Sequence, residues 1–194
     1  MLSTFRPAIV LFGALTLLVG VLYPLLVTGI GQAVFPAQAA GSITLRAGQP
    51  VGSSLIGQPF SSPKYFWGRP SATSPMPNNA SASGGSNLGP TNPALTDAVK
   101  GRADALRALD PSNQALIPVD LVTASSSGLD PDISMAAALY QVGRIATARR
   151  IAPEKVRELI DSQQQRQYVG FFGEPAVNVL ALNLALDAQT AHTR

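Results

Sequence analysis

Residues 8–30 read AIVLFGALTLLVGVLYPLLVTGI, and this stretch decides the architecture of the chain. It lies within a longer window, residues 7–45, that contains no Asp, Glu, Lys or Arg. Roughly 20 apolar residues in a helix are enough to cross the hydrocarbon core of a bilayer, where the backbone must satisfy its own hydrogen bonds. The sequence therefore predicts a transmembrane helix over residues 8–30 after a short N-terminus (1–7), with a kink near Tyr23-Pro24.

A cleaved signal peptide is the competing interpretation of the same stretch. Ala37-Gln38-Ala39 has the small-x-small pattern of a signal peptidase site. The apolar part of a signal peptide is shorter, however, at about 7–15 residues, and it usually follows several positive charges. Here only Arg6 and the terminal amine precede the run. We therefore expect a retained membrane anchor.

The charges that flank the run predict its orientation. Arg6 and the terminal amine precede it, and within about 20 residues after it the only Lys or Arg is Arg46. The positive-inside rule then favours a cytoplasmic N-terminus, with residues 31–194 outside the inner (plasma) membrane of a bacterium. The two flanks of the run differ by about one positive charge.

The composition of residues 31–194 excludes several classes of function. They carry 13 of the 14 Lys and Arg and all 11 Asp and Glu, which leaves a net charge of +2. That balance, without a basic stripe interleaved with aromatics, argues against nucleic acid as a partner. The absence of cysteine excludes disulfides, thiolate metal ligands and a thiol nucleophile.

Residues 58–93 form a long stretch rich in Pro, Ser, Gly and Asn. Such a composition is typical of linkers, and disorder is its simplest interpretation. The aromatic run Tyr65-Phe66-Trp67 and the pair Gly84-Gly85 oppose disorder, because aromatics seek burial and glycines permit special backbone conformations. We expect an ordered but irregular excursion within one outer domain.

The remaining patterns predict an α+β domain, with a few short strands and a mostly helical second half. Strands are expected at residues 43–45 and, with Pro118 at an edge or bulge, at 116–123. Helix starts are expected where capping residues and prolines meet, at Asn92-Pro93, Asp130-Pro131-Asp132, Pro153 and Glu174-Pro175.

Three side-chain patterns accompany these helices. Arg144, Arg149 and Arg150 crowd the last turns of the second helix, where the helix dipole favours cations. An Arg157–Asp161 pair is expected on the third helix. The fourth helix is apolar on several faces, including Leu180 and Leu184, which predicts burial or contact with a partner.

The search for catalytic and metal-binding residues predicts neither a catalytic residue nor a metal site nor a cofactor of the chain's own. The single histidine, His192, lies three residues from the end, where solvated tails are usual. Asp130 and Asp132 are explained by helix capping. The run 84–89 lacks the lysine of a phosphate-binding loop, and turn formation explains its glycines.

Two interpretations of the aromatic cluster stay open: it pins the irregular stretch onto the domain, or it contacts another subunit. The candidates for contact with a partner are Tyr65, Phe66, Trp67, Arg69, Gly84, Gly85, Asn87, Leu180 and Leu184.

Taken together, six ordered blocks behind an apolar helix resemble the C subunit (KdpC) family of the bacterial Kdp potassium-transporting P-type ATPase. The resemblance covers about nine tenths of the chain, and one departure is Gly143, where the family's pattern has proline. The blocks are Tyr23–Gly29, Leu55–Gln58 with Tyr65–Ser71, Ala82–Pro93, Pro118–Ser125 with Ser127–Pro131, Tyr140–Val142, and Gly173–Pro175 with Val177–Leu180 and Leu182–Asp187.

The resemblance implies a non-catalytic subunit of a potassium-import complex in the bacterial inner membrane. Its implied partners are a channel-like potassium-binding subunit, a P-type ATPase subunit, a small membrane subunit and the lipid bilayer. ATP and potassium are handled by the complex, and this subunit assembles and stabilises the others.

The resemblance also implies a second role, that of a catalytic chaperone that raises the ATPase subunit's affinity for ATP. The candidates near nucleotide are then Ser127, Gly128, Leu129, Asp130 and Gln141. This role conflicts with the predicted orientation, which places those residues outside, away from ATP. An exported hydrolase cleaved after Ala39 and a membrane-tethered ligand-binding module are the alternatives from other functional classes.

Overall fold

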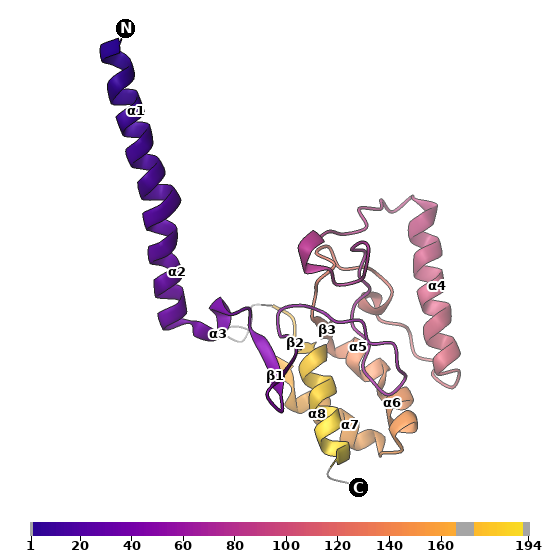
Figure 1. Ribbon diagram of the computed structural model, residues 1–194. Coiled ribbons are helices and arrows are strands. Elements are labelled where there is room, and N and C mark those ends of the chain that lie inside the picture. Colours follow the sequence, from indigo (N-terminus) through magenta and orange to yellow (C-terminus); the bar gives the residue numbers. More distant parts are fainter. Residues whose placement is uncertain (1, 166–172, 192–194) are drawn as a thin grey trace. The chain divides into compact units, whose positions relative to one another are not determined.

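The chain divides into two compact units, Met1–Val51 and Gly52–Arg194, and the computed structural model describes residues 2–165 and 173–191 (Figure 1). The elements of the first unit are α1 (Leu2–Leu17), a π-helical turn η1 (Leu18–Leu22), α2 (Tyr23–Val34), α3 (Pro36–Ala39) and β1 (Ile43–Arg46). Strand β1 pairs with β2 (Gln49–Ser53) through a tight turn at Ala47 and Gly48, both with positive φ.

Within the described residues, one helix, Phe5–Val34, is long and apolar enough to cross a membrane. It spans 30 residues, and an 18-residue window within it has a mean hydropathy of 2.4. The expected irregularity near Tyr23-Pro24 takes the form of the π-helical turn, in which the Tyr23 N–H donates to the carbonyl of Leu18. A proline ring clashes with the carbonyl four residues earlier, here that of Gly20, and a π turn relieves that conflict.

The second unit is an α+β fold, as the sequence predicts. Its elements are η2 (Ala80–Ala82), α4 (Pro93–Leu109), η3 (Val119–Leu121), β3 (Asp132–Ser134), α5 (Met135–Tyr140), α6 (Val142–Arg149), α7 (Pro153–Ser162), β4 (Gln164–Gln165), β5 (Ala176–Asn178) and α8 (Val179–Ala191).

A small antiparallel sheet, in the order β3-β5-β4, organises this unit. Two of its strands run directly into helices, β3 into α5 and β5 into α8. The last residue of each strand caps the helix: Ser134 Oγ accepts from the Ala137 N–H, and Asn178 Oδ1 from the Ala181 N–H. The pairing of β3 with β5 therefore fixes where both helices begin.

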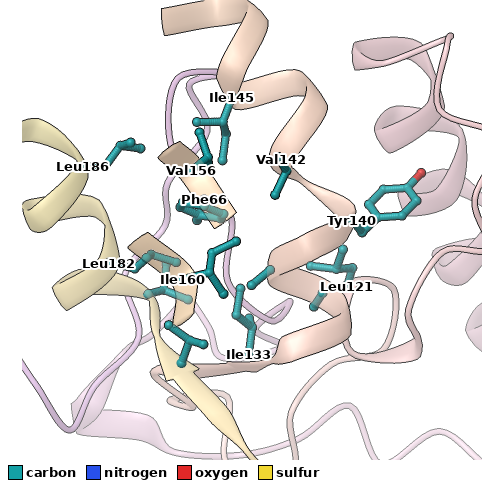
Figure 2. Close-up of a cluster of buried hydrophobic side chains, with 14 of the residues drawn as sticks. Phe66, Leu121, Ile133, Tyr140, Val142, Ile145, Val156, Ile160, Leu182 and Leu186 are labelled. Carbon is teal, nitrogen blue, oxygen red and sulfur yellow. The ribbon is translucent and has the colours of Figure 1, made fainter. Parts of the chain in front are cut away.

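The hydrophobic core lies between this sheet and helices α5 to α8 (Figure 2). Phe66, from the irregular stretch, is fully buried at its centre. Its buried neighbours in the cluster include Ile133, Val142, Ile145, Val156, Ile160, Leu182 and Leu186. A segment with no regular structure of its own thus contributes the largest fully buried side chain among the described residues of the core.

Two sequence-based helix starts are confirmed. Asn92 caps α4, with its Oδ1 accepting from the Ala94 N–H, and α7 begins at Pro153 with Val156 and Ile160 buried. The strand at residues 43–45 is confirmed as β1.

Four other expectations were wrong. Residues 116–123 form no strand: Pro118 lacks an N–H for a ladder, and a 3-10 turn, η3, follows it. The helices expected at Asp130 and Glu174 begin later, at Met135 and Val179, because β3 and β5 intervene. Arg157 pairs with Glu154, one turn back, instead of Asp161.

Candidate functional site

The segment of residues 62–71, termed the clamped segment, is held by side chains in place of a neighbouring strand. Asn183 on α8 uses both ends of its amide on one residue: the Phe66 N–H donates to Oδ1 at 2.8 Å, and Nδ2 donates to the Phe66 carbonyl at 3.0 Å. Gln141 binds the backbone of Trp67 in the same way: the Trp67 N–H donates to Oε1 at 2.8 Å, and Nε2 donates to the Trp67 carbonyl at 3.1 Å. Both amides are buried, so each replaces water for a backbone donor and acceptor.

Arg144 extends this clamp toward the start of the segment. Its guanidinium donates to the carbonyls of Pro63 (2.6 Å) and Tyr65 (3.1 Å) and to Gln141 Oε1 (2.6 Å). It also lies over the Trp67 ring, 4.9 Å from the centroid. Burial lowers the pKa of Arg144 to about 10, partly offset by the negative charge of Asp110.

A second arginine holds the aromatic cluster from the outside. Arg149 donates to the Lys64 carbonyl at 2.7 Å and pairs with Asp187 at 2.8 Å. The Tyr65 hydroxyl donates to the other oxygen of Asp187, and Arg149 lies 4.9 Å from the centre of the Tyr65 ring. Arg149 lies in the last turn of α6, where the sequence predicts a cation, and both Arg144 and Arg149 in addition contact the clamped segment.

The loop of residues 125–130 packs on the other end of the clamped segment. Arg69 pairs with Asp130 at 2.9 Å, and the Ser71 hydroxyl donates to the Gly128 carbonyl at 2.7 Å. Asp130 also accepts from the N–H of Asp132, so this carboxylate closes a turn before β3.

The structure accounts for four of the five nucleotide-proximal candidates as follows. Ser127 Oγ accepts from the Leu129 N–H, Gly128 is buried with a positive φ of 67°, and Asp130 pairs with Arg69. Gln141 lies with Trp67 and Arg144, and its amide is already committed to them. These residues therefore fall into two hydrogen-bonded clusters joined by the clamped segment.

The glycine-rich candidates pack against the same loop. The Gly84 N–H donates to the Ser127 carbonyl at 2.9 Å, and a Cβ on Gly85 would lie 2.9 Å from the Ser126 carbonyl oxygen. Asn87 is exposed and has a positive φ of 52°. Asn87 thus has the left-handed backbone conformation expected within the run, whereas Gly84 and Gly85 have no positive φ, and at Gly85 it is the close approach to Ser126 that leaves no room for a side chain.

The remaining partner candidates divide between core and surface. Phe66 is buried within the chain, Leu180 is buried, and Leu184 is half-buried on the same helix. Trp67 and Arg69 are half-buried and line one cavity. Whether any of them meets a partner stays a prediction.

A surface that the sequence interpretation missed lies at Leu116, Val119 and Leu139, termed the apolar patch. Their exposed fractions are 94%, 69% and 45%. Leu116 and Leu139 line a hollow of about 500 Å³ together with Tyr140. Residues 116–119 were missed because they were assigned to a strand, whose apolar side chains would have been half-buried.

Tyr140 lines this hollow, and its hydroxyl is buried without a hydrogen-bond partner among the described residues. Figure 2 shows it pointing away from the hydrophobic cluster. Burial, with a smaller contribution from the charge of Asp110, raises the pKa of Tyr140.

Among the described residues, no group of three or more His, Asp or Glu side chains is placed to hold a metal ion. His192 lies outside the described residues. The features described above are side chains that hold the clamped segment in place and an exposed apolar patch. Such features suit positioning of the chain and binding to another molecule.

Known proteins match this chain over nearly its whole length. A family model described as "KdpC: K+-transporting ATPase, c chain" matches residues 5–188. Similar proteins are the potassium-transporting ATPase KdpC subunits of Janthinobacterium sp. (strain Marseille), 69% identical over 96% of this chain and 99% of the relative, and of Herminiimonas arsenicoxydans, 67% identical over 96% and 98%. The same-named subunit of Polaromonas naphthalenivorans is 66% identical over 97% of this chain and 96% of the relative.

Proposed function

Because the chain belongs to the KdpC family of potassium-transporting ATPase subunits, we propose that it is a non-catalytic subunit that assembles and stabilises an ATP-driven potassium-import complex. Its partners in this proposal are a channel-like potassium-binding subunit, a P-type ATPase subunit and a small membrane subunit. Family membership favours this function over an exported hydrolase or a tethered ligand-binding module.

The observation that carries the proposal is the apolar patch. Three large apolar side chains of the second unit, Leu116, Val119 and Leu139, are left in solvent, and two of them rim a hollow. Apolar side chains that gather beside a hollow on a folded domain favour a site of protein–protein contact.

The apolar helix supplies the second part of the proposal. At about 1.5 Å per residue, Phe5–Val34 is longer than the roughly 30 Å hydrocarbon core, so it can span with some tilt. We place the single span at residues 8–30 in the bacterial inner membrane, with residues 1–7 in the cytoplasm and 31–194 outside. The hydrogen bonds of Gln141 do not support direct contact with ATP, because its amide is used within the domain.

The test is recovery of the complex from bacteria grown at low potassium. The tagged full chain is purified in gentle detergent and its partners are identified by mass. Wild type is expected to bring down a P-type ATPase and a channel-like subunit with potassium-stimulated ATP hydrolysis. Leu116→Ser combined with Leu139→Ser should lower that recovery severalfold, whereas Leu55→Ser, at another exposed leucine, should not.

Each outcome bears on a different part of the proposal. Recovery of the chain alone would contradict membership in a complex. Full recovery with the doubly substituted patch would contradict the patch as the contact surface. Denaturation curves of the variants show whether a lower recovery reflects contact or folding.

A further inference from the structure

A cavity of about 240 Å³ lies between α4 and the clamped segment. Helix α4 contributes Arg102, Ala105 and Leu106 to its wall, and the clamped segment contributes its residues 67–71, including Trp67 and Arg69. The other lining residues are Gln58, Pro59, Phe60, Pro77, Asn78 and Leu121. The wall is thus mostly apolar and aromatic, with a few polar groups that could orient a ligand.

The charged side chains on the wall of the cavity are positive. Among the described residues that line it, Arg69 and Arg102 are the charged ones and none is acidic. The Asp130 carboxylate satisfies one nitrogen of Arg69, whereas Arg69 Nε is buried and has no hydrogen-bond partner in the described part of the chain. Arg102 donates to the carbonyl of Val122, a neutral acceptor.

The two guanidinium groups on the wall favour a negatively charged ligand. The half-buried guanidinium of Arg102 loses part of its hydration, and its hydrogen bond to a neutral carbonyl compensates only part of that loss. Burial accordingly lowers the pKa of Arg102. A carboxylate accepts from two guanidinium donors at once and forms strong charge-assisted hydrogen bonds. A potassium ion is disfavoured by the same charges.

The size of the cavity limits the rest of the ligand. An apolar cavity of about 150 Å³ is enough for benzene. A space of about 240 Å³ therefore suits one ring with a short acidic arm. Phe60, Trp67 and Leu106 supply apolar and aromatic surface for the ring.

We propose that this cavity binds a free small organic carboxylate with an apolar, ring-sized body, held at its carboxylate by Arg69 and Arg102. The proposal is separate from the function in potassium import and does not depend on it. The ligand's ring packs beside Trp67, and its acid faces the two guanidinium groups.

The chain provides its own reporter, because Trp67 is its single tryptophan and lines the cavity. The full chain in detergent is titrated with phenylacetate while Trp67 fluorescence is recorded. Phenylacetamide serves as the neutral probe of the same shape, and phenethylamine as the cationic probe. We expect a saturable change with phenylacetate, and at least a tenfold weaker response to the other two, since a hydrogen bond to a charged group contributes about 1.5–3 kcal/mol.

Two substitutions and a control separate binding from folding. Arg102→Gln should weaken phenylacetate binding about tenfold or more, whereas Arg107→Gln, on the same helix but outside the cavity wall, should leave it unchanged. Ala105→Leu should block the cavity while keeping both arginines. Denaturation curves of each variant identify any loss of folding.

Three outcomes would overturn the proposal: no saturable response from the wild-type chain, an equal response to phenylacetamide, or undiminished binding by a folded Ala105→Leu chain. If Arg102→Gln loses binding only because it unfolds, the result with Ala105→Leu decides, because that substitution changes no charge.

Discussion

Asn183 and Phe66, 117 positions apart in the chain, are joined by two hydrogen bonds through one side-chain amide. The amide serves the N–H and the carbonyl of Phe66 together, as a neighbouring strand would. It thereby lets a residue without regular structure place a fully buried ring in the core (Figure 2).

Replacing Asn183 by alanine is expected to destabilise the domain by about 2–4 kcal/mol. The change leaves a buried donor and a buried acceptor of Phe66 unpaired, each costing about 1–3 kcal/mol. Chemical denaturation of the full chain in detergent, followed by circular dichroism, measures the loss. Gln114→Ala is the control, since that amide also donates to a backbone carbonyl but on the surface. Equal losses for both variants would contradict the clamp.

Gln141 is expected to matter for folding and not for ATP. Gln141→Ala removes the partners of the backbone N–H and carbonyl of Trp67 and one acceptor of Arg144, so a loss similar to that of Asn183→Ala is expected. Gln141→Glu keeps the acceptors but not the donors, and its stability should fall between alanine and wild type. Complexes assembled with Gln141→Glu should bind ATP with unchanged affinity in equilibrium titrations. A tenfold weaker affinity at wild-type stability would show that Gln141 acts on nucleotide binding.

Local signals in the sequence were sufficient for the elements that depend on local interactions. The apolar run predicts the long helix, and Asn92-Pro93 and Pro153 predict two helix starts, because caps and the missing proline N–H act within one turn. Gly143, where proline was expected, lies at the second residue of α6, a position that tolerates proline.

Long-range pairing decided the elements that the sequence misplaced. Asp130 and Glu174 look like helix starts, yet each precedes a three-residue strand that exists because β3 pairs with β5. No local pattern reports a partner more than 40 residues away. The clamp has the same character: Gln141 and Asn183 read as ordinary helix residues, and their partners are backbone atoms of a distant segment.

Gly128 is expected to accept no side chain. Its φ is positive, and a Cβ there would lie 2.4 Å from Thr73 Cγ2 and 2.7 Å from the Gly84 carbonyl oxygen. Gly128→Ala should therefore cost about 2 kcal/mol or more, from backbone strain and overpacking together. Gly84 lies in the irregular segment that packs on this loop, and a Cβ there would have no atom within 4 Å. Gly84→Ala should therefore change stability by less than about 1 kcal/mol. Denaturation of both variants checks the contrast, which would fail if Gly128→Ala were as stable as Gly84→Ala.

Asp132 is expected to lower stability as the pH rises. Burial raises its pKa above the ordinary 3.8, against the hydrogen bond from Asn178. The folded chain then holds the proton more tightly than the unfolded chain, so the cost is absent below pH 3.8 and is fully present above the raised pKa. Asp132→Asn should thus be more stable than wild type at pH 7, by up to about 1 kcal/mol, with no gain at pH 3. Asp104→Asn gives the opposite sign, because the hydrogen bond and charge of Lys100 lower the pKa of Asp104. Denaturation midpoints at both pH values test this, and a gain for Asp132→Asn that persists undiminished at pH 3 would assign it to packing instead of charge.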